Sequence, residues 1–296
     1  MSVQPTHTPY DGSARPFTIG LKPLDLARWI EVDRHRDAYL AEKRRLYDEI
    51  PDKIFVAEEG TKAAQQEVLE LIAGHLQRHL PALGADGAPG SPRSEPPLRI
   101  ASLLVQEDLV LMRRGDDGWR LAAASLCFPS SWSLEEKFGR PLQDIHAPVP
   151  GFGRGTRTAD LIHRIFDNLA VEQPVERFNW SLQAGADLYQ PLSNVARAGR
   201  ARARPSRFPQ ADVAANAFIR VERQTLRRLP GSGDILFTIR IYLDPMPVLE
   251  RHAGRATLAA SFAAQLAALD TAQLDYKGLA ADRDRLVERL TAMAQP

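Results

Sequence analysis

The sequence contains a single cysteine. Cys127 is the only one among 296 residues, which excludes an intramolecular disulfide framework, a four-cysteine zinc site and a cysteine-ligated iron–sulfur cluster. Leu126 and Phe128 flank it in a segment typical of a half-buried strand. Because free cysteine is among the most frequently buried residues, we expect Cys127 to pack in the core and not to act as a nucleophile.

The chain also lacks a long apolar run and a strong excess of either charge. The N-terminal segment "MSVQPTHTPYDGSARPF" has no basic region followed by an apolar one, so neither a secretory signal nor a transmembrane helix is predicted. The formal net charge is +1, which gives no electrostatic reason to bind nucleic acid or an anionic membrane. We therefore expect a cytoplasmic protein that has neither as a partner.

Apolar residues are abundant enough for a sizeable core. With 44% hydrophobic and 25% charged residues, the composition is that of a folded protein and allows one large domain or two modest ones. The Pro- and Gly-rich segment 81–97 is predicted to be an exposed loop and not a domain linker, since the strands after it need the earlier helices to cover them. A second loop is expected near 191–210. We expect one domain over residues 1–296.

Hydrophobic periodicity predicts a mixed α+β fold. The expected elements are helices over 33–51, 61–80 and 159–169 and after Pro247, a strand over 177–183, and two hairpins that turn at "GDDG" (115–118) and "LPGSGD" (229–234). In the second hairpin, the alternation from Ile235 to Leu243 is typical of a strand with one buried face.

Two short patterns on helices lead to narrower predictions. Ser133 and Glu136 have the spacing of a capping box at the start of a short helix, which Gly139 would end. His75 and His79 lie four residues apart, a spacing that can present two metal ligands on one helix face. The intervening Leu-Gln-Arg lacks the glutamate of a zinc protease motif, so we expect ordinary surface histidines.

Arginine recurs through the segment 197–207, without apolar periodicity. Such a run can bind phosphates or an acidic partner, but it has no interleaved aromatic residues for base stacking, apart from Phe208 at its edge. We expect a solvated loop. If the run is functional, docking of a protein partner is favoured over nucleic acid. Its members are Arg197, Arg200, Arg202, Arg204 and Arg207.

Two titratable residues stand in unusual surroundings. His146 precedes "APVPG", in which Pro148 and Pro150 restrict the backbone. A rigid backbone that holds one imidazole suits a metal ligand or a general base, although a structural histidine fits the pattern as well. Glu222 lies in the middle of a predicted strand, where it faces either solvent or a pocket, and strand alternation alone does not decide which.

Four segments in order resemble the family of heme-dependent oxidative N-demethylases, in particular its alpha-subunit-like members. They are "LLVQEDLVLM", "ASLCFPSSWSLEEKFGRPLQDIHAPVPG", "NWSL" and "RVERQTLRRLP" with "ILFTIRIYLDP", and the resemblance runs from about Leu24 to Leu279. It implies a PAS-like antiparallel sheet that encloses a b-type heme, with additional N- and C-terminal helices.

The activity that this resemblance implies is O2-dependent demethylation of a small secondary amine such as dimethylamine, through hydroxylation of the N-methyl carbon and release of formaldehyde. Electrons would come from NAD(P)H through a reductase with FMN and an iron–sulfur centre, and tetrahydrofolate would accept the formaldehyde. With one cysteine and no dinucleotide fingerprint, this chain needs that reductase as a separate subunit.

The resemblance also suggests roles for single residues. His146 would be the proximal heme ligand and Glu222 would lie near the substrate amine, as its partner or proton acceptor. Asn179 and Trp180 would line the pocket. Three arginines would bind heme propionates or folate carboxylates, because a guanidinium group matches a carboxylate in bidentate fashion. They are Arg220, Arg223 and Arg240.

Two other functions remain open from the sequence. The same fold could be a non-catalytic heme sensor or carrier, or a scaffold without heme. Formaldehyde release with a supplied electron donor distinguishes the enzyme from the sensor. The Arg-rich segment before the Glu222 strand matches no motif of the family, and the substrate amine is not determined by the resemblance.

Overall fold

One antiparallel sheet runs through the molecule. The computed structural model describes residues 4–84 and 95–295. Its seven strands follow the order β1-β5-β6-β7-β3-β4-β2. They are β1 (Lys22–Pro23), β2 (Phe55–Ala57), β3 (Asp108–Gly115), β4 (Gly118–Ser125), β5 (Val175–Ala184), β6 (Ala217–Arg228) and β7 (Ile235–Pro245). The mixed α+β class and both predicted hairpins, β3–β4 and β6–β7, are confirmed.

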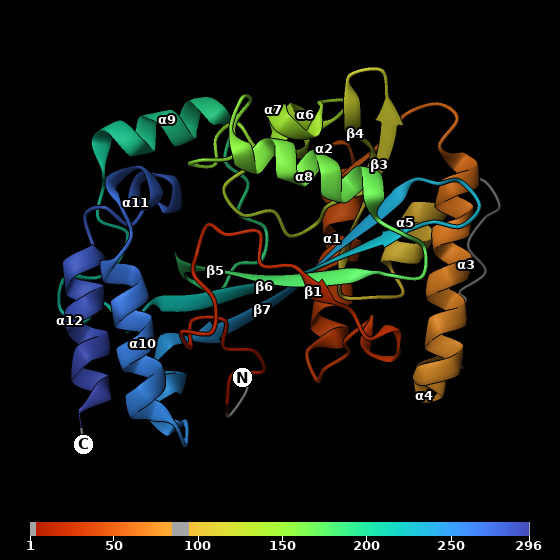
Figure 1. Ribbon diagram of the computed structural model, residues 1–296. Coiled ribbons are helices and arrows are strands. Elements are labelled where there is room, and N and C mark those ends of the chain that lie inside the picture. Colours follow the sequence, from red (N-terminus) through yellow and green to blue (C-terminus); the bar gives the residue numbers. More distant parts are fainter. Residues whose placement is uncertain (1–3, 85–94, 296) are drawn as a thin grey trace.

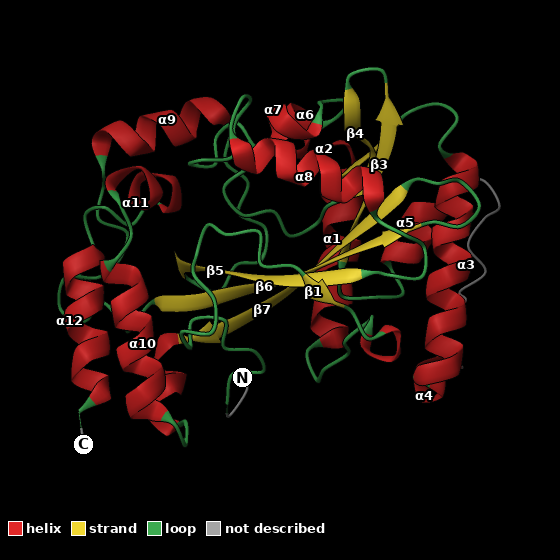
Figure 2. Ribbon diagram, in the orientation of Figure 1, coloured by secondary structure: helices red, strands yellow, loops and turns green. Residues whose placement is uncertain are grey.

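Helices cover both faces of this sheet (Figures 1 and 2). The longer ones are α1 (Arg36–Glu49), α3 (Lys62–His79), α8 (Arg157–Asn168), α9 (Asn194–Ala203), α10 (Arg255–Ala267) and α12 (Arg283–Ala294). The shorter ones are α2 (Pro51–Ile54), α4 (Pro81–Gly84), α5 (Pro97–Ser102), α6 (Leu134–Lys137), α7 (Leu142–Ile145) and α11 (Thr271–Lys277), with 3-10 turns at η1 (Leu26–Arg28) and η2 (Met246–Arg251). The predicted helices over 33–51, 61–80 and 159–169 are confirmed as α1, α3 and α8. None of the described helices is long and apolar enough to cross a bilayer.

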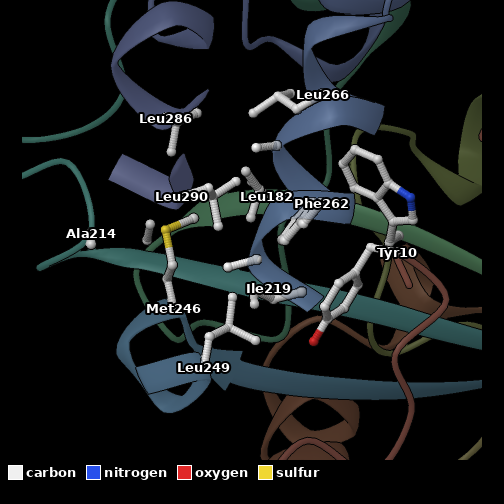
Figure 3. Packing of buried hydrophobic residues seen from close by; sticks show 14 of the residues in the cluster. Tyr10, Leu182, Ala214, Ile219, Met246, Leu249, Phe262, Leu266, Leu286 and Leu290 are labelled. Atoms are coloured by element: carbon white, nitrogen blue, oxygen red, sulfur yellow. The ribbon is translucent and has the colours of Figure 1, made fainter. Parts of the chain in front are cut away.

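Three apolar clusters fill the space on the two sides of the sheet. On one face, Ile219 of β6 lies in one cluster with Phe262 of α10 and Leu290 of α12 (Figure 3), and Val221 of β6 belongs to the same cluster. Farther along the same face, α3 and α5 pack on Leu109 and Leu111 of β3. On the opposite face, Val110 and Met112 pack beneath α6, α7 and α8. The alternation along β3 therefore sends neighbouring side chains into different clusters.

The prediction that β7 has one buried face is wrong, because both of its faces are covered. Ile235, Ile239 and Ile241 are buried in the cluster beneath α8, whereas Leu236 on the other face is completely buried against α3 and α5. Arg240 shares the face of Leu236 and is also buried. Cys127 is buried as predicted, and burial raises the pKa of its thiol to about 12.

The loop predicted near 191–210 contains a helix instead. Residues 194–203 form α9, since alanine and arginine both have high helix propensity and the Ser193 hydroxyl accepts the amide of Ala196 at 3.1 Å as an N-cap. Arg204 ends the helix in a left-handed conformation with φ +43°. No residue of α9 is buried, which explains why apolar periodicity does not reveal this helix. The other predicted loop, 81–97, falls mostly on residues 85–94, outside the described part of the chain, and its first four residues form α4 instead.

Two further local predictions are wrong. Ser133 makes no side-chain bond at the start of α6. The carboxylate of Glu136 accepts the amide of Asn194 instead, at 2.9–3.0 Å, and so joins α6 to α9. His75 is buried rather than on the surface, with its ring edge against Trp29, while His79 is exposed as predicted.

Candidate functional site

A cavity of about 270 Å³ lies between the sheet and the helices α6, α7 and α8, which Figure 1 shows on one side of the strands. Its size is near the lower end of the range for small-molecule sites. The sheet supplies one wall, with residues of β3, β4, β5, β6 and β7. The facing wall comes from the segment 130–152 and from α8. Phe17 to Leu21, the end of α11 and residues of the α9 region complete the lining.

One part of this cavity is apolar. Val110 and Met112 of β3, Ile239 of β7 and Phe166 of α8 contribute to its wall, and Leu226 of β6 joins them. All of them also belong to the apolar cluster beneath α8. This part of the cavity suits a large hydrophobic ligand surface, which gains free energy when it leaves water.

The adjoining part is polar because β5 and β6 turn polar faces toward the cavity. Along β5, Arg177, Asn179, Ser181 and Gln183 all line it, at the two-residue spacing of one strand face. In the antiparallel register Asn179 lies opposite Glu222 and Arg177 lies opposite Gln224. The strand pairing thus places an amide, a carboxylate and a guanidinium group side by side on one wall.

Glu222 is the one carboxylate among the described lining residues. Its side chain is 18% exposed. One oxygen lies 3.4 Å from Nε of Arg220, and the other accepts a hydrogen bond from the Gln224 amide at 3.0 Å. Arg220 and Gln224 share a strand face with Glu222, so β6 itself orients the carboxylate. A carboxylate held in this way can accept a hydrogen bond from an ammonium group or take up its proton.

Five cationic side chains also line the cavity, and none forms an ion pair within 4.0 Å with any described residue. Instead, each of them donates a hydrogen bond to a backbone carbonyl, at distances between 2.5 and 3.3 Å. They are Lys137, Arg177, Arg197, Arg207 and Lys277. Burial lowers the pKa of both Lys137 and Lys277 to about 8, and it also lowers the pKa of Arg177 and Arg207.

His146 lies on the facing wall, directly after α7. Its ring contacts Phe152 at a centroid distance of 6.2 Å, and no described residue forms a hydrogen bond with its ring nitrogens. Burial, followed by the nearby charges of Arg177 and Lys137, lowers the pKa of the imidazole to about 4. At neutral pH the ring is uncharged and carries a free lone pair, which is the form that binds metals.

The cavity therefore brings together three of the predicted site residues, His146, Glu222 and Asn179. Trp180 is not among the described lining residues. It points to the opposite face of the sheet, where its ring packs on Phe262 and its Nε1 donates to Gln265 at 3.0 Å. The reason is the strand alternation, which sends Trp180 and its neighbour Asn179 to opposite faces.

The three arginines predicted to bind carboxylates of a ligand have partners inside the protein and are not among the described lining residues. Arg220 is completely buried and donates to the carbonyl of Phe128 at 2.5 Å. Arg223 lies on the opposite face, where it donates to Glu176 at 2.8 Å and to the Trp29 carbonyl at 3.0 Å. Arg240 also lies there, with its guanidinium 2.8 Å from Asp33.

Several cavity residues were not predicted from the sequence as site residues, although Arg197 and Arg207 belong to the arginine run that was expected to be a solvated loop, and Arg177 had a signal of its own. Arg177 begins the polar alternation of "RFNWSLQ", but a polar strand face normally indicates solvent. The remaining cations reach the cavity from α6, the α9 region and α11, and only the tertiary structure brings these together. They are Lys137, Arg197, Arg207 and Lys277.

Within the described residues, no group of three or more His, Cys, Asp or Glu side chains is placed to hold a metal ion. His146 is the one imidazole among the described lining residues, and a metal within a macrocycle can be held by such a single protein ligand. In the comparison with protein families, residues 20–287 match the model described as "Haem-dependent oxidative N-demethylase, alpha subunit-like".

Proposed function

We propose a function from the premise that this chain belongs to the family of heme-dependent oxidative N-demethylase, alpha subunit-like proteins. In this proposal the cavity between the sheet and α8 holds heme, and the protein removes an N-methyl group oxidatively from a small secondary amine. The observation that carries the proposal is the neutral imidazole of His146, which has no hydrogen-bond partner among the described residues and lies on the wall of a half-apolar cavity. An antiparallel sheet with a ligand cavity under helices on one face also supports the predicted PAS-like arrangement.

The residues of the cavity fit a heme group. His146 would bind the heme iron, and the apolar wall around Met112 and Phe166 would contact the apolar part of the group. Two of the unpaired cations, such as Lys137 and Arg197, would face its carboxylates, a role for which they are better placed than the buried Arg220, Arg223 and Arg240. When bound, the group supplies the activation of dioxygen.

Glu222 and Asn179 would hold the amine. A secondary amine is an ammonium ion at neutral pH, and the carboxylate of Glu222 can accept its hydrogen bond and then its proton, which frees the nitrogen lone pair. Arg220 and Gln224 keep the carboxylate in position. In the net reaction one oxygen atom of O2 ends in formaldehyde and the other in water. Two electrons and two protons enter, and the amine leaves without its methyl group.

The electrons must come from another protein. An alpha-subunit-like chain implies a partner subunit, and we propose that this partner is a reductase that carries FMN and an iron–sulfur centre and oxidises NAD(P)H. Tetrahydrofolate as the formaldehyde acceptor and a cytoplasmic location belong to the same proposal.

The visible absorption spectrum, before and after dithionite, tests the cofactor. The wild type should show a Soret band that shifts on reduction, and His146→Ala should lose it. His163→Ala is a matched control, because His163 on α8 is a neighbouring histidine that does not line the cavity. A Soret band that survives unchanged in His146→Ala would show that the ligand is a different residue.

Formaldehyde release with a supplied electron donor tests the reaction. We expect Glu222→Gln to keep the Soret band and to lose turnover by at least about 100-fold, the usual contribution of a positioned acid or base. A spectrum that responds to amines without release of formaldehyde by the wild type would contradict the enzyme and support a heme sensor or carrier.

A further inference from the structure

The charges of the cavity do not balance. Five lining cations face one lining carboxylate, Glu222. Two of them are largely removed from water, Lys137 at 5% and Lys277 at 7% exposure. Buried cations without a counter-charge are costly, which is also why burial lowers the pKa of both lysines. None of the five has an ion pair with a described residue, so an anionic group of a ligand in the cavity finds cations with which it can pair.

A heme group alone does not supply enough negative charge. Its two carboxylates and Glu222 would leave two of the five cations uncompensated. The proposed function then meets an electrostatic difficulty, because a simple dialkylammonium ion would enter a site that is already positive. Like charges in a site of low dielectric repel each other strongly. A substrate with a negative group of its own avoids this repulsion.

The arrangement around Glu222 indicates where this negative group lies. Arg177 stands opposite Gln224 in the strand register, and Gln224 donates to Glu222. Burial lowers the pKa of Arg177 and of Lys277, whereas the negative charge of Glu222 raises both. Both cations therefore lie close enough to this carboxylate to interact with it electrostatically. A small ligand whose ammonium group contacts Glu222 would therefore have a positive side chain, Arg177 or Lys277, next to its other end.

Arg177 is the better carboxylate receptor of the two. Its Nε is buried and has no hydrogen-bond partner in the described structure, and its one hydrogen bond goes from a terminal nitrogen to the carbonyl of Thr18 at 3.1 Å. The N–H groups that remain free on its two terminal nitrogens form the fork that binds a carboxylate in bidentate fashion. Lys277 already has several partners within the protein, since its Nζ donates to the carbonyl of Trp180 and lies over the rings of Trp180 and Phe17.

We infer that the substrate is an N-methylated amine that also carries a carboxylate, that is, an N-methyl amino acid, bound with its ammonium group at Glu222 and its carboxylate at Arg177. This inference rests on the proposed function and narrows its substrate class. The ligand is a zwitterion with no net charge, so it enters the positive cavity without the repulsion that dimethylamine meets.

Isothermal titration of the purified holoprotein with N-methylglycine and with dimethylamine tests this inference without any turnover. The wild type should bind N-methylglycine at least 10-fold more tightly. Arg177→Gln should lose at least 10-fold in affinity for N-methylglycine and should bind dimethylamine as well as, or better than, the wild type. Arg177→Lys keeps the charge without the fork and should give an intermediate loss.

The matched control is Arg164→Gln, since Arg164 is an exposed arginine of α8 outside the cavity lining. It should bind both ligands like the wild type. Circular dichroism and the Soret band of each variant establish that it is folded and loaded. Equal or tighter binding of dimethylamine by the wild type would overturn the inference, and so would an Arg177→Gln variant that keeps its affinity for N-methylglycine.

Formaldehyde release separates this inference from the function on which it rests. If dimethylamine yields formaldehyde and N-methylglycine has no binding advantage, the inference fails and the proposed function stands. If N-methylglycine binds through Arg177 but no amine yields formaldehyde, the proposed function fails and the recognition of an amino acid stands.

Discussion

Two arginines on neighbouring strands have opposite roles. Arg177 of β5 faces the cavity, and its Nε has no partner in the described structure. Arg223 of β6 points to the other face, where Glu176 and two backbone carbonyls satisfy its guanidinium. The residue type is the same, yet only Arg223 has its whole guanidinium group occupied by partners within the protein. At the scale of single residues, hydrogen-bond satisfaction is therefore our reason for proposing Arg177, and not Arg223, as a binding group.

His75 supports a prediction on the pH dependence of stability. It is 3% exposed, and the charged groups near it are positive: His79 and Arg78 on its own helix, and Arg227 on β6. Burial first, and then these charges, lower its pKa from 6.5 to about 4. Between these values the unfolded chain binds a proton that the folded chain does not bind, so stability is lost as the pH falls through this window.

We expect the free energy of unfolding to fall by roughly 1–3 kcal/mol between pH 7 and pH 4.5 because of His75, since one pKa unit is worth about 1.4 kcal/mol. Urea titrations at both pH values should show this loss in the wild type and a smaller one in His75→Gln. His79→Gln removes one of the positive charges that lower the pKa of His75 but leaves its burial, the largest cause, in place, so this variant should retain most of the wild-type loss. Parallel pH profiles for wild type and His75→Gln would contradict the prediction.

At the scale of elements, α9 and α11 show how polar contacts position a helix. In α9, Arg200 donates to the carbonyl of Tyr276, and Arg204 pairs with Asp275 at 2.7 Å. Both contacts reach α11, whose last residues, Tyr276 and Lys277, line the cavity. Because α9 has no buried residue, these contacts and the bond from the Asn194 amide to Glu136 hold the helix beside the site.

The capping box of α11 gives a prediction for this element. The Asp270 side chain accepts the amide of Gln273 at 2.9 Å, and the Gln273 side chain accepts the amide of Asp270 at 3.1 Å. Asp270→Ala should cost about 1 kcal/mol of unfolding free energy, the usual value of an N-cap. Asp270→Asn retains a capping side chain and should stay near the wild type. Thermal unfolding followed by circular dichroism measures both, and an unchanged melting temperature in Asp270→Ala would contradict the role of the cap.

At the scale of the whole molecule, one sheet connects all the apolar clusters. The strand β7 contributes Leu236 to the cluster with α3, Tyr242 to the cluster with α10 and α12, and Ile239 to the cluster beneath α8. A change in one cluster therefore acts on a strand that the other two also need. For this reason we expect residues 1–296 to unfold as one cooperative domain.

Three tryptophans allow this expectation to be measured, because each belongs to a different cluster: Trp29, Trp119 and Trp180. Variants that retain one of these three residues, with the other two and the fourth tryptophan, Trp132, replaced by phenylalanine, should show fluorescence transitions that coincide with the circular dichroism transition of the same variant in urea. Separate midpoints for the fluorescence and the circular dichroism of a variant would show that the chain contains more than one folding unit.

The sequence by itself determined the local elements and the family. Periodicity predicted α1, α3 and α8, turn residues predicted both hairpins, and the ordered motifs led to the family that the match over residues 20–287 confirmed. These features depend on residues that are close in the sequence or on the order of motifs along it, so the sequence alone is sufficient to predict them.

Only the tertiary structure decided which residues meet. Alternation along β5 and β6 predicts that Asn179 and Trp180 lie on opposite faces, but not which face is covered by α8 and encloses the cavity. It likewise does not reveal that Arg220 binds the Phe128 carbonyl while Nε of Arg177 has no partner in the described structure. The physical reason is that the role of a side chain depends on the groups that it contacts in the folded protein. These groups come from segments that are far apart in the chain.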